Sequence, residues 1–292
     1  MEKREKDILE ELKENYDKGL VSALVGAGFS KNVSDSFLSW GELLHDMVGE
    51  VYAIEFKRYY DNYFQQFRGV STGLKSEEKV KDEFISEKIQ EDDYLELVSK
   101  YIKKKGIRES VETYIENRTP YAAFDTEKKI VLKIGDKEKE PVFETKFSAH
   151  KELLLLDKLQ NIYTTNYENL IEFTEKLMDV GELSYLPDLV INGNGLSDRI
   201  GRSVIKIHGN LRQKSDERIF FDGDNKLQYI ISKEDYDTYK DKHEAFTLLM
   251  KIAMLQGRFM LLGFSGTDSN YKGWVTWMSD ILDRKIDNVS KI

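Results

Sequence analysis

Apolar residues near the N-terminus first follow the period of a helix and then that of a buried strand. Residues 6–19 place Ile8, Leu12 and Tyr16 on one helical face. The stretch 21–25 is nearly all apolar, as in a strand buried on both faces of a parallel sheet. The pattern therefore predicts a helix that leads into a central strand.

The same alternation returns in the second half of the chain. The pattern predicts helices and strands in turn, with helices at 151–159 and 170–177 and strands at 161–165, 189–191, 204–207 and 259–262. Strands that alternate with helices favour a mostly parallel sheet with helices on its faces. The expected fold class is α/β, with a Rossmann-like sheet.

Residues 52–148 have a different character, because they are rich in Tyr, Lys and Glu. They contain helical patches at 94–102 and 107–115 and one strand-like stretch at 130–134. Just before them, the string Ser39-Trp40-Gly41-Glu42 has the capping-box pattern of a helix start. We expect a mainly helical insertion at about 52–148 within one domain spanning 1–292.

Composition narrows the classes of protein that fit this pattern. The 292 residues are 40% hydrophobic and 33% charged, enough for a full core, and the net charge of -9 weighs against direct binding of nucleic acid or anionic lipid. The chain has no Cys and its four His are far apart, so we expect no metal. It shows neither a signal peptide nor an apolar run of membrane-spanning length, so we expect a cytoplasmic protein without a membrane role.

Polar or glycine-rich strings follow four of the expected strands. They are Gly26-Ala27-Gly28-Phe29-Ser30, Thr164-Thr165-Asn166-Tyr167-Glu168, Lys206-Ile207-His208-Gly209-Asn210 and Gly263-Phe264-Ser265-Gly266-Thr267-Asp268. In a parallel sheet, the carboxyl ends of the strands share one edge, and ligands of open α/β sheets bind there. One ligand could therefore contact all four strings.

Each string has a functional interpretation and a purely structural one. Gly26 and Gly28 suit a turn whose N–H groups approach a diphosphate, or an ordinary strand-to-loop turn, since the full dinucleotide fingerprint is absent. Asn166 could orient a ribose hydroxyl or a water molecule, or cap the next helix. His208 could act as a general base, because imidazole titrates near neutral pH, or be a structural histidine bound to a loop.

The last string and the remaining histidines are read in the same way. Ser265 and Asp268 either contact the adenine ribose or form the turn into the final helix. His45, His150 and His243 do not follow a strand, and we expect them to be structural.

Taken together and in this order, the strings resemble the sirtuin-like (silent-information-regulator type) domains of bacterial antiphage defence proteins. Trp40, the string Ser232-Lys233-Glu234-Asp235-Tyr236 and a histidine at His150 also have counterparts in that family. The resemblance spans both ends of the chain and leaves out the insertion.

The resemblance implies that the protein binds NAD+ and cleaves its bond between nicotinamide and ribose. It implies that Asn166 and His208 are catalytic. It places Ala27, Gly28 and Ser30 along the diphosphate, and Ser265 and Asp268 near the adenosine half. The expected NAD+-binding residues are Gly26, Ala27, Gly28, Phe29, Ser30, Thr165, Asn166, His208, Gly263, Ser265 and Asp268.

Two departures from the wider sirtuin group refine this expectation. Protein deacylases of that group carry a four-cysteine zinc ribbon and a Pro-Asp-Phe-Arg-like cofactor loop, whereas this chain has no Cys and has Ser36-Phe37-Leu38-Ser39-Trp40 at the loop. Peptide deacylation is therefore disfavoured. Glu168 stands where many relatives have Asp, which lengthens the side chain by one methylene.

The sequence thus predicts an NAD+ glycohydrolase that depletes NAD+ in antiphage defence by abortive infection. The first alternative is a non-catalytic module that senses NAD+ or ADP-ribose and signals to a partner. The least favoured alternative is a protein deacylase. The resemblance also implies a homo-oligomer and a sensor domain or partner chain. The trigger, the number of subunits and whether the chain is part of a longer protein stay open.

Overall fold

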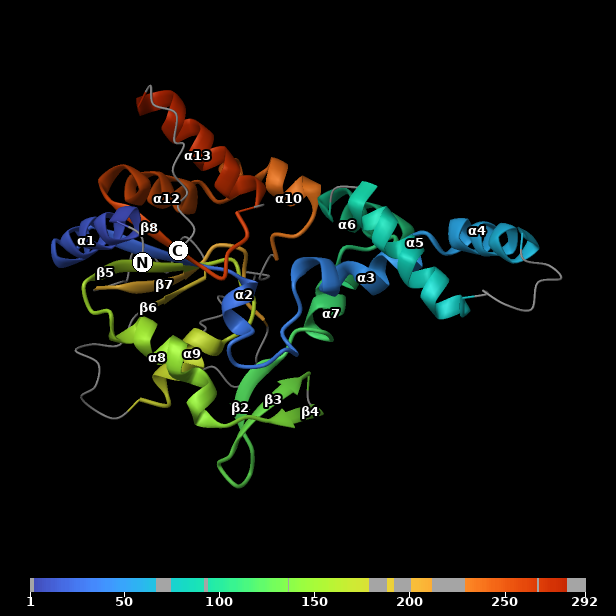
Figure 1. The fold of residues 1–292 in the computed structure, drawn as a ribbon, viewed down its shortest axis with the longest axis horizontal. Helices are drawn as coiled ribbons and strands as arrows, with labels where there is room; N and C mark the ends of the chain where they lie inside the picture. The colour runs from blue at the N-terminus through green and yellow to red at the C-terminus, as the bar shows by residue number, and fades with distance from the viewer. Residues whose placement is uncertain are drawn as a thin grey trace. The chain divides into compact units, whose positions relative to one another are not determined.

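The chain divides into two compact units in the computed structural model (Figure 1). The structure describes residues 3–66, 75–91, 94–135, 137–178, 188–191, 201–211, 229–266 and 268–282. The α/β unit comprises Met1–Phe37, Thr119–Ile230 and Tyr236–Ile292. The helical unit comprises Leu38–Arg118 and Ile231–Asp235.

A five-stranded sheet forms the centre of the α/β unit. Its strand order is β6-β7-β5-β1-β8, and every neighbouring pair is parallel. The strands are β1 (Val21–Val25), β5 (Leu159–Thr164), β6 (Asp188–Val190), β7 (Ser203–Lys206) and β8 (Arg258–Leu262). The expected α/β fold class with a parallel, Rossmann-like sheet is confirmed.

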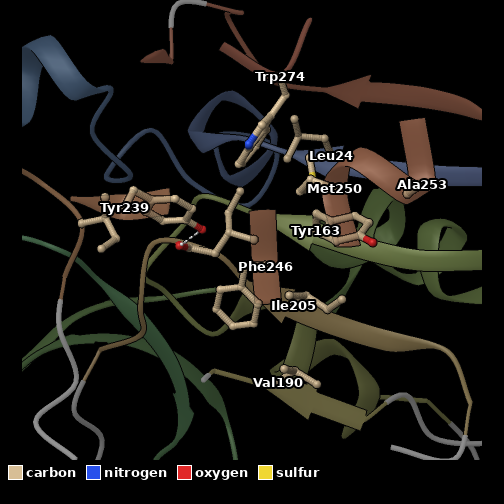
Figure 2. Packing of buried hydrophobic residues seen from close by; sticks show 11 residues of the cluster. Leu24, Tyr163, Val190, Ile205, Tyr239, Phe246, Met250, Ala253 and Trp274 are labelled. Atoms are coloured by element: carbon tan, nitrogen blue, oxygen red, sulfur yellow. Dashed lines mark hydrogen bonds between the residues drawn. The ribbon is translucent and has the colours of Figure 1, made fainter. Parts of the chain in front are cut away.

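Helices cover both faces of this sheet because successive strand residues point to opposite sides. On one face, Leu24 and Tyr163 pack with apolar side chains of α12 (Glu244–Gln256) and α13 (Ser269–Leu282), as Figure 2 shows. On the other face, Ala23, Val25 and Ile162 pack against α8 (Ser148–Leu155) and α9 (Leu170–Glu175). These two apolar layers hold the strand ends in a fixed register.

The N-terminal helix α1 (Lys3–Asp17) ends two residues before the glycine expected to stop it. Gly19 has φ +68°, its N–H donates to the Tyr16 carbonyl at 2.8 Å, and the Leu20 N–H donates to the Asn15 carbonyl at 2.9 Å. This is a Schellman motif, in which a left-handed glycine satisfies the last helical carbonyls. The chain then enters β1 directly.

The other helices of the α/β unit are short or follow loops. They are α2 (Ala27–Ser30), the 3-10 helix η1 (Glu144–Phe147) and α11 (Tyr239–Lys242). The helix expected at 151–159 begins and ends earlier, as α8, because Leu156 leaves helical geometry and β5 begins at Leu159. An apolar run does not by itself show where a helix gives way to a buried strand.

The helical unit contains α3 (Trp40–Val51), α4 (Ala53–Gln66), α5 (Glu77–Glu91), α6 (Tyr94–Lys105) and α7 (Glu109–Glu116). The capping box at the start of α3 is confirmed, since the Ser39 N–H donates to Glu42 Oε2 at 2.6 Å and the Ser39 hydroxyl accepts from the Glu42 N–H at 3.4 Å. Val48, Ile85 and Leu97 form the centre of the unit's core. The segment Ile231–Asp235 enters α10 (Lys233–Asp237), and Asp235 pairs with Arg108 at 2.8 Å.

The stretch 52–148 is shared between the two units. Its helical part belongs to a unit that already begins at Leu38, and 119–147 belongs to the α/β unit. There, β2 (Tyr121–Phe124), β3 (Ile130–Ile134) and β4 (Lys137–Pro141) form an antiparallel sheet. The strand expected at 130–134 is confirmed, whereas β4 has mostly charged residues, and only pairing with β3 reveals it as a strand. No helix in the described ranges is both long and apolar enough to span a bilayer.

Candidate functional site

Two polar loops leave adjacent strands at the carboxyl edge of the five-stranded sheet. Thr164 and Lys206 are register partners at the ends of β5 and β7, and the Ile207 N–H donates to the Thr164 carbonyl at 3.0 Å. Asn166 and His208 each follow two residues after these ends. Both side chains are enclosed, at 8% and 4% relative exposure. The parallel sheet thus brings the two expected catalytic residues to the same edge.

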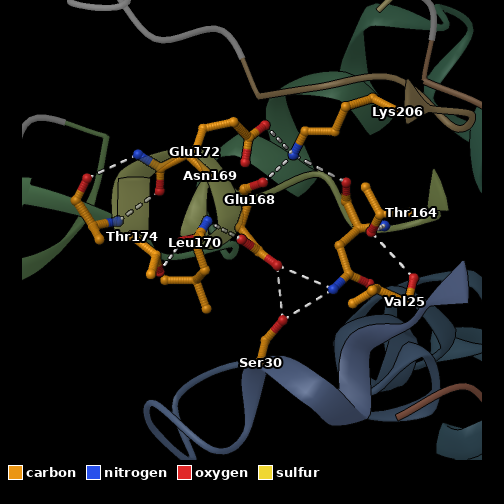
Figure 3. A network of polar contacts seen from close by, with 11 residues as sticks. Val25, Ser30, Thr164, Glu168, Asn169, Leu170, Glu172, Thr174 and Lys206 are labelled. Atoms are coloured by element: carbon orange, nitrogen blue, oxygen red, sulfur yellow. Dashed lines mark hydrogen bonds and ion pairs between the residues drawn. The ribbon is translucent and has the colours of Figure 1, made fainter. Parts of the chain in front are cut away.

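Asn166 is held by a buried network that joins the β5 loop to α2. Its Nδ2 donates to Ser30 Oγ and to Glu168 Oε1, both at 3.0 Å, and Ser30 Oγ donates to the same carboxylate oxygen at 2.7 Å (Figure 3). Glu168 also accepts the N–H of Leu170 at the start of α9. Glu168, and not Asn166, therefore makes the contact that a capping residue would make. The first and second polar strings are brought together here.

Lys206 secures the same loop from β7. Its Nζ lies 3.0 Å from Glu172 Oε1, and it donates to the main-chain carbonyls of Asn166, at 3.4 Å, and of Glu168 (Figure 3). Lys206 and Glu172 are 1% and 4% exposed. Burial raises the pKa of Glu172, and the Lys206 charge acts in the opposite direction. Neither residue was predicted from the sequence to have a role, although a lysine inside the apolar run 204–207 is a signal of a buried charge.

His150 lies close to this network from α8. Its ring centroid is 4.5 Å from that of Phe29, and its Nδ1 has no hydrogen-bond partner among the described residues. Burial lowers the pKa of His150 to about 4, and the nearby Glu168 charge opposes this shift. The imidazole is therefore neutral at neutral pH.

His208 has a separate set of partners. Its Nε2 lies 3.5 Å from Asp268 Oδ2, and the Tyr236 hydroxyl donates to that same oxygen at 2.7 Å. The rings of His208 and Tyr236 meet edge to face, with centroids 5.5 Å apart. Asp268 Oδ1 accepts the Tyr271 N–H at 2.9 Å, so this residue also forms the turn into α13. Both His208 and Asp268 are candidate residues from the sequence, but their contact with each other was not predicted.

Two backbone hydrogen bonds and one side-chain hydrogen bond connect the loops that carry the two groups. The Leu211 N–H donates to the Tyr167 carbonyl at 2.9 Å, the Tyr167 hydroxyl donates to the Ile230 carbonyl at 2.9 Å, and the Ile230 N–H donates to the His208 carbonyl at 3.0 Å. Asn166 therefore sits with Ser30 and Glu168, whereas His208 sits with Asp268 and Tyr236. The candidate site consists of these two groups along one sheet edge.

The glycine turn after β1 packs directly on the loop after β8. The N–H groups of Gly26 and Gly28 donate to the carbonyls of Leu262 and Gly263 at 3.0 and 2.9 Å, and the Phe29 N–H donates to Gly26 at 3.0 Å. A Cβ at Gly28 would lie 2.9 Å from the Gly263 carbonyl oxygen. The N–H groups of Gly26 and Gly28, which the sequence suggested for a diphosphate, thus have acceptors within the chain, and these glycines allow close backbone packing.

The remaining expected residues line the same edge. The Thr165 N–H donates to the Val25 carbonyl at 3.2 Å, Ala27 is half-buried in α2, and Ser265 is exposed in the loop after β8. Thr267 lies outside the described residues. Within the described ranges, no three His, Asp or Glu side chains gather as possible metal ligands.

Comparison with known proteins gives a match to one family model and none to a curated protein. The model of the SIR2-like domain matches residues 160–288. This range contains β5 except Leu159, together with β7, β8 and α13. It therefore includes Asn166, Lys206, His208 and Asp268, while β1 and the glycine turn precede it. Over residues 160–288 the chain is therefore similar to SIR2-like domains, and domains of that type use NAD+.

Proposed function

We propose that this protein is an NAD+ glycohydrolase that cleaves the bond between nicotinamide and ribose. One observation carries the proposal: the region similar to SIR2-like domains holds two buried polar side chains, Asn166 and His208, just after the carboxyl ends of the adjacent parallel strands β5 and β7. Open α/β sheets bind nucleotides at this edge.

Departure of nicotinamide needs no acid catalyst. The pyridinium nitrogen of NAD+ already carries the positive charge, so nicotinamide leaves neutral and needs no proton from the protein. Positive charge builds on the ribose as the bond breaks, as in other glycosyl transfers. Water attacks the ribose carbon and loses one proton, and the products are nicotinamide, ADP-ribose and that proton.

The two side chains have complementary roles in this step. The amide of Asn166, fixed by Ser30 and Glu168, orients the attacking water or a ribose hydroxyl. His208 accepts the proton. We assign Ala27, Ser30, Thr165 and Ser265 to the remainder of the NAD+ surface, because they follow the same strand ends. The glycine turns, whose N–H groups are bonded within the chain, support this surface by close packing.

A second candidate is a module that senses NAD+ or ADP-ribose without cleaving it. The two hydrogen bonds that Asn166 Nδ2 donates within the chain favour it, since the amide is committed to Ser30 and Glu168 before any ligand arrives. Both functions require ligand binding, and only hydrolysis releases nicotinamide with time.

A purified-protein assay tests the proposal. The protein is incubated with NAD+, with and without an acylated peptide, and nicotinamide and ADP-ribose are followed by mass spectrometry. Asn166→Ala and His208→Ala should each lower turnover about 100-fold or more, with far-UV circular dichroism unchanged. Asn15→Ala and His45→Ala remove the same residue types elsewhere and should turn over like the wild type.

Each outcome selects one function. Nicotinamide release by both site variants at the wild-type rate would refute the assignment. Binding of NAD+ without any product, also after lysate of phage-infected cells is added, would favour the sensing module. Release that depends on the acylated peptide would indicate a deacylase.

The role in the cell is part of the proposal. The resemblance to antiphage proteins supports depletion of NAD+ during infection by a homo-oligomer that acts with a sensor domain or partner chain. Measuring NAD+ in infected cells that express wild-type protein or His208→Ala tests this role, because only the wild type should lower it.

A further inference from the structure

Asp268 is placed to act on His208 in a way that the sequence did not indicate. The loop after β8 carries Asp268 toward the loop after β7, and the two side chains approach to 3.5 Å between Oδ2 and Nε2. Both are enclosed, with side chains 5% and 10% exposed. An enclosed carboxylate at this distance interacts with an imidazolium more strongly than it would in water.

The carboxylate is itself held from two sides. The Tyr236 hydroxyl donates to Oδ2 at 2.7 Å, and the Tyr271 N–H donates to Oδ1 at 2.9 Å. The oxygen that caps α13 is therefore different from the oxygen that faces His208. These two hydrogen bonds fix the direction of the Asp268 carboxylate, with Oδ2 shared between the Tyr236 hydroxyl and the imidazole.

Among the described residues with a printed contact to the His208 ring, Asp268 is the one that supplies negative charge. Tyr236 from α10 and Tyr239 from α11 also face the His208 ring, at centroid distances of 5.5 and 6.4 Å. Burial raises the pKa of both tyrosines, so they stay neutral, and Tyr236 keeps the proton that it donates to Asp268.

We propose that Asp268, oriented by Tyr236, is a positioning residue that holds the His208 imidazole and stabilises its positively charged form. Its consequence for catalysis rests on the proposed NAD+ hydrolysis. When His208 takes the proton from the attacking water, the Asp268 side chain offsets the new positive charge. The contact between the two side chains does not depend on that function.

Substitutions can separate this role from the capping of α13. Asp268→Asn keeps an oxygen for the Tyr271 N–H, because Asn caps helices as well as Asp does, but it removes the charge. Tyr236→Phe keeps the ring and removes the hydroxyl that orients the carboxylate. The matched controls are Asp157→Asn and Tyr16→Phe, since Tyr16 donates to Asp157 Oδ1 at 3.0 Å in a surface pair before β5.

The first measurement is a titration of the imidazole signals by nitrogen-15 NMR. The chain has four His, and His208→Gln identifies the His208 signal by its disappearance. In Asp268→Asn, the midpoint of the His208 titration should move to lower pH, because the positive form loses its counter-charge. Tyr236→Phe should also alter this midpoint, and the two control variants should not.

The second measurement is the pH dependence of NAD+ hydrolysis. Asp268→Asn should lower kcat about 10-fold or more with little change in KM. The acid limb of its kcat/KM profile should move to lower pH, since a base with a weaker hold on its proton is already free at lower pH. A purely structural role for Asp268 would lower activity without moving that limb.

The two measurements test the role of Asp268 and the proposed hydrolysis separately. An unchanged His208 midpoint in Asp268→Asn, or an equal change in Asp157→Asn, would overturn the assignment of Asp268. A wild-type protein that releases no nicotinamide would refute the proposed hydrolysis, and the NMR titration would still decide whether Asp268 controls His208.

Discussion

His150 and Glu172 are ionisable residues enclosed by the α/β unit, and burial moves their pKa values in opposite directions. It lowers the pKa of His150 to about 4 and raises that of Glu172, because in each case the neutral form is easier to bury. Glu172 has Lys206 to offset its charge, whereas the Nδ1 of His150 has no hydrogen-bond partner among the described residues. The neutral His150 therefore behaves as part of the packing around Phe29.

This difference predicts how stability depends on pH. The unfolded chain protonates His150 near pH 6.5 and the folded chain near pH 4, so within this range the unfolded state binds more protons and the free energy of unfolding falls as the pH falls. Between pH 7.5 and pH 5, His150 should contribute a loss of about 2 kcal/mol. Urea unfolding at the two pH values measures it. His150→Gln should remove this loss and His45→Gln should keep it, and equal losses in the wild type and His150→Gln would contradict the prediction.

At the scale of elements, the β1–α2 turn and the loop after β8 are fitted to each other through glycines. Gly263 has φ +58°, and a Cβ there would lie 1.9 Å from the Phe29 nitrogen, a backbone atom. Gly266, three residues later, has φ +73°, and nothing lies within 4 Å of its would-be Cβ. A side chain at Gly263 would therefore meet both backbone strain and a steric clash, whereas one at Gly266 would meet backbone strain alone.

We expect Gly263→Ala to destabilise the protein far more than Gly266→Ala. Gly266→Ala adds only the strain of a left-handed residue, about 1 kcal/mol. Gly263→Ala adds that strain and must also push apart β8 and α2. We therefore expect it to lower the free energy of unfolding by about 4 kcal/mol or more. Chemical denaturation of the two variants measures the difference. Equal losses would show that the close contact between the two loops is not rigid.

A second connection between elements joins β7 to α9 and the β5 loop through Lys206. Lys206→Met should cost about 3 kcal/mol or more at neutral pH, because it leaves Glu172 buried without its counter-charge. Lys206→Met combined with Glu172→Leu should recover much of this loss, since buried ion pairs often tolerate apolar replacement. A double-mutant cycle by urea unfolding measures the coupling, and additive effects would rule it out.

On the scale of the whole molecule, the described elements differ widely in how their backbones are protected. β1 and β5 are each paired on both sides, and their residues are mostly buried. In the helical unit, α4 has no buried side chain, and Ile54 and Phe64 on it are 69% and 51% exposed. Local opening is cheapest where few apolar contacts are lost.

Hydrogen exchange followed by mass spectrometry should reveal this difference. Peptides that contain β1 and β5 should exchange only on global unfolding, and those from α4 should exchange orders of magnitude faster. The capped helix α3, whose buried side chains include Leu44 and Met47, is the control within the same unit and should be slower than α4. Protection of α4 equal to that of β5 would be inconsistent with the burial of its side chains.

Several features of the fold and site could be read from the sequence because they depend on local patterns. Apolar periods located β1, β5, β7 and β8, and the capping box located the start of α3. The two flanking strands of the small sheet could not be read, since β2 and β4 are defined by their hydrogen bonds to β3 and not by their own residues. The division of residues 52–148 between two units depends in the same way on distant contacts.

By itself, the sequence determined that the sheet is parallel and that polar residues follow its strands, because both follow from the order and period of side chains along the chain. Only the tertiary structure decided which of those residues meet: Ser30 with Glu168, 138 positions away, Lys206 with Glu172, and His208 with Asp268. A hydrogen bond or ion pair depends on distances of a few ångströms between side chains, and folding alone sets those distances for residues far apart in sequence.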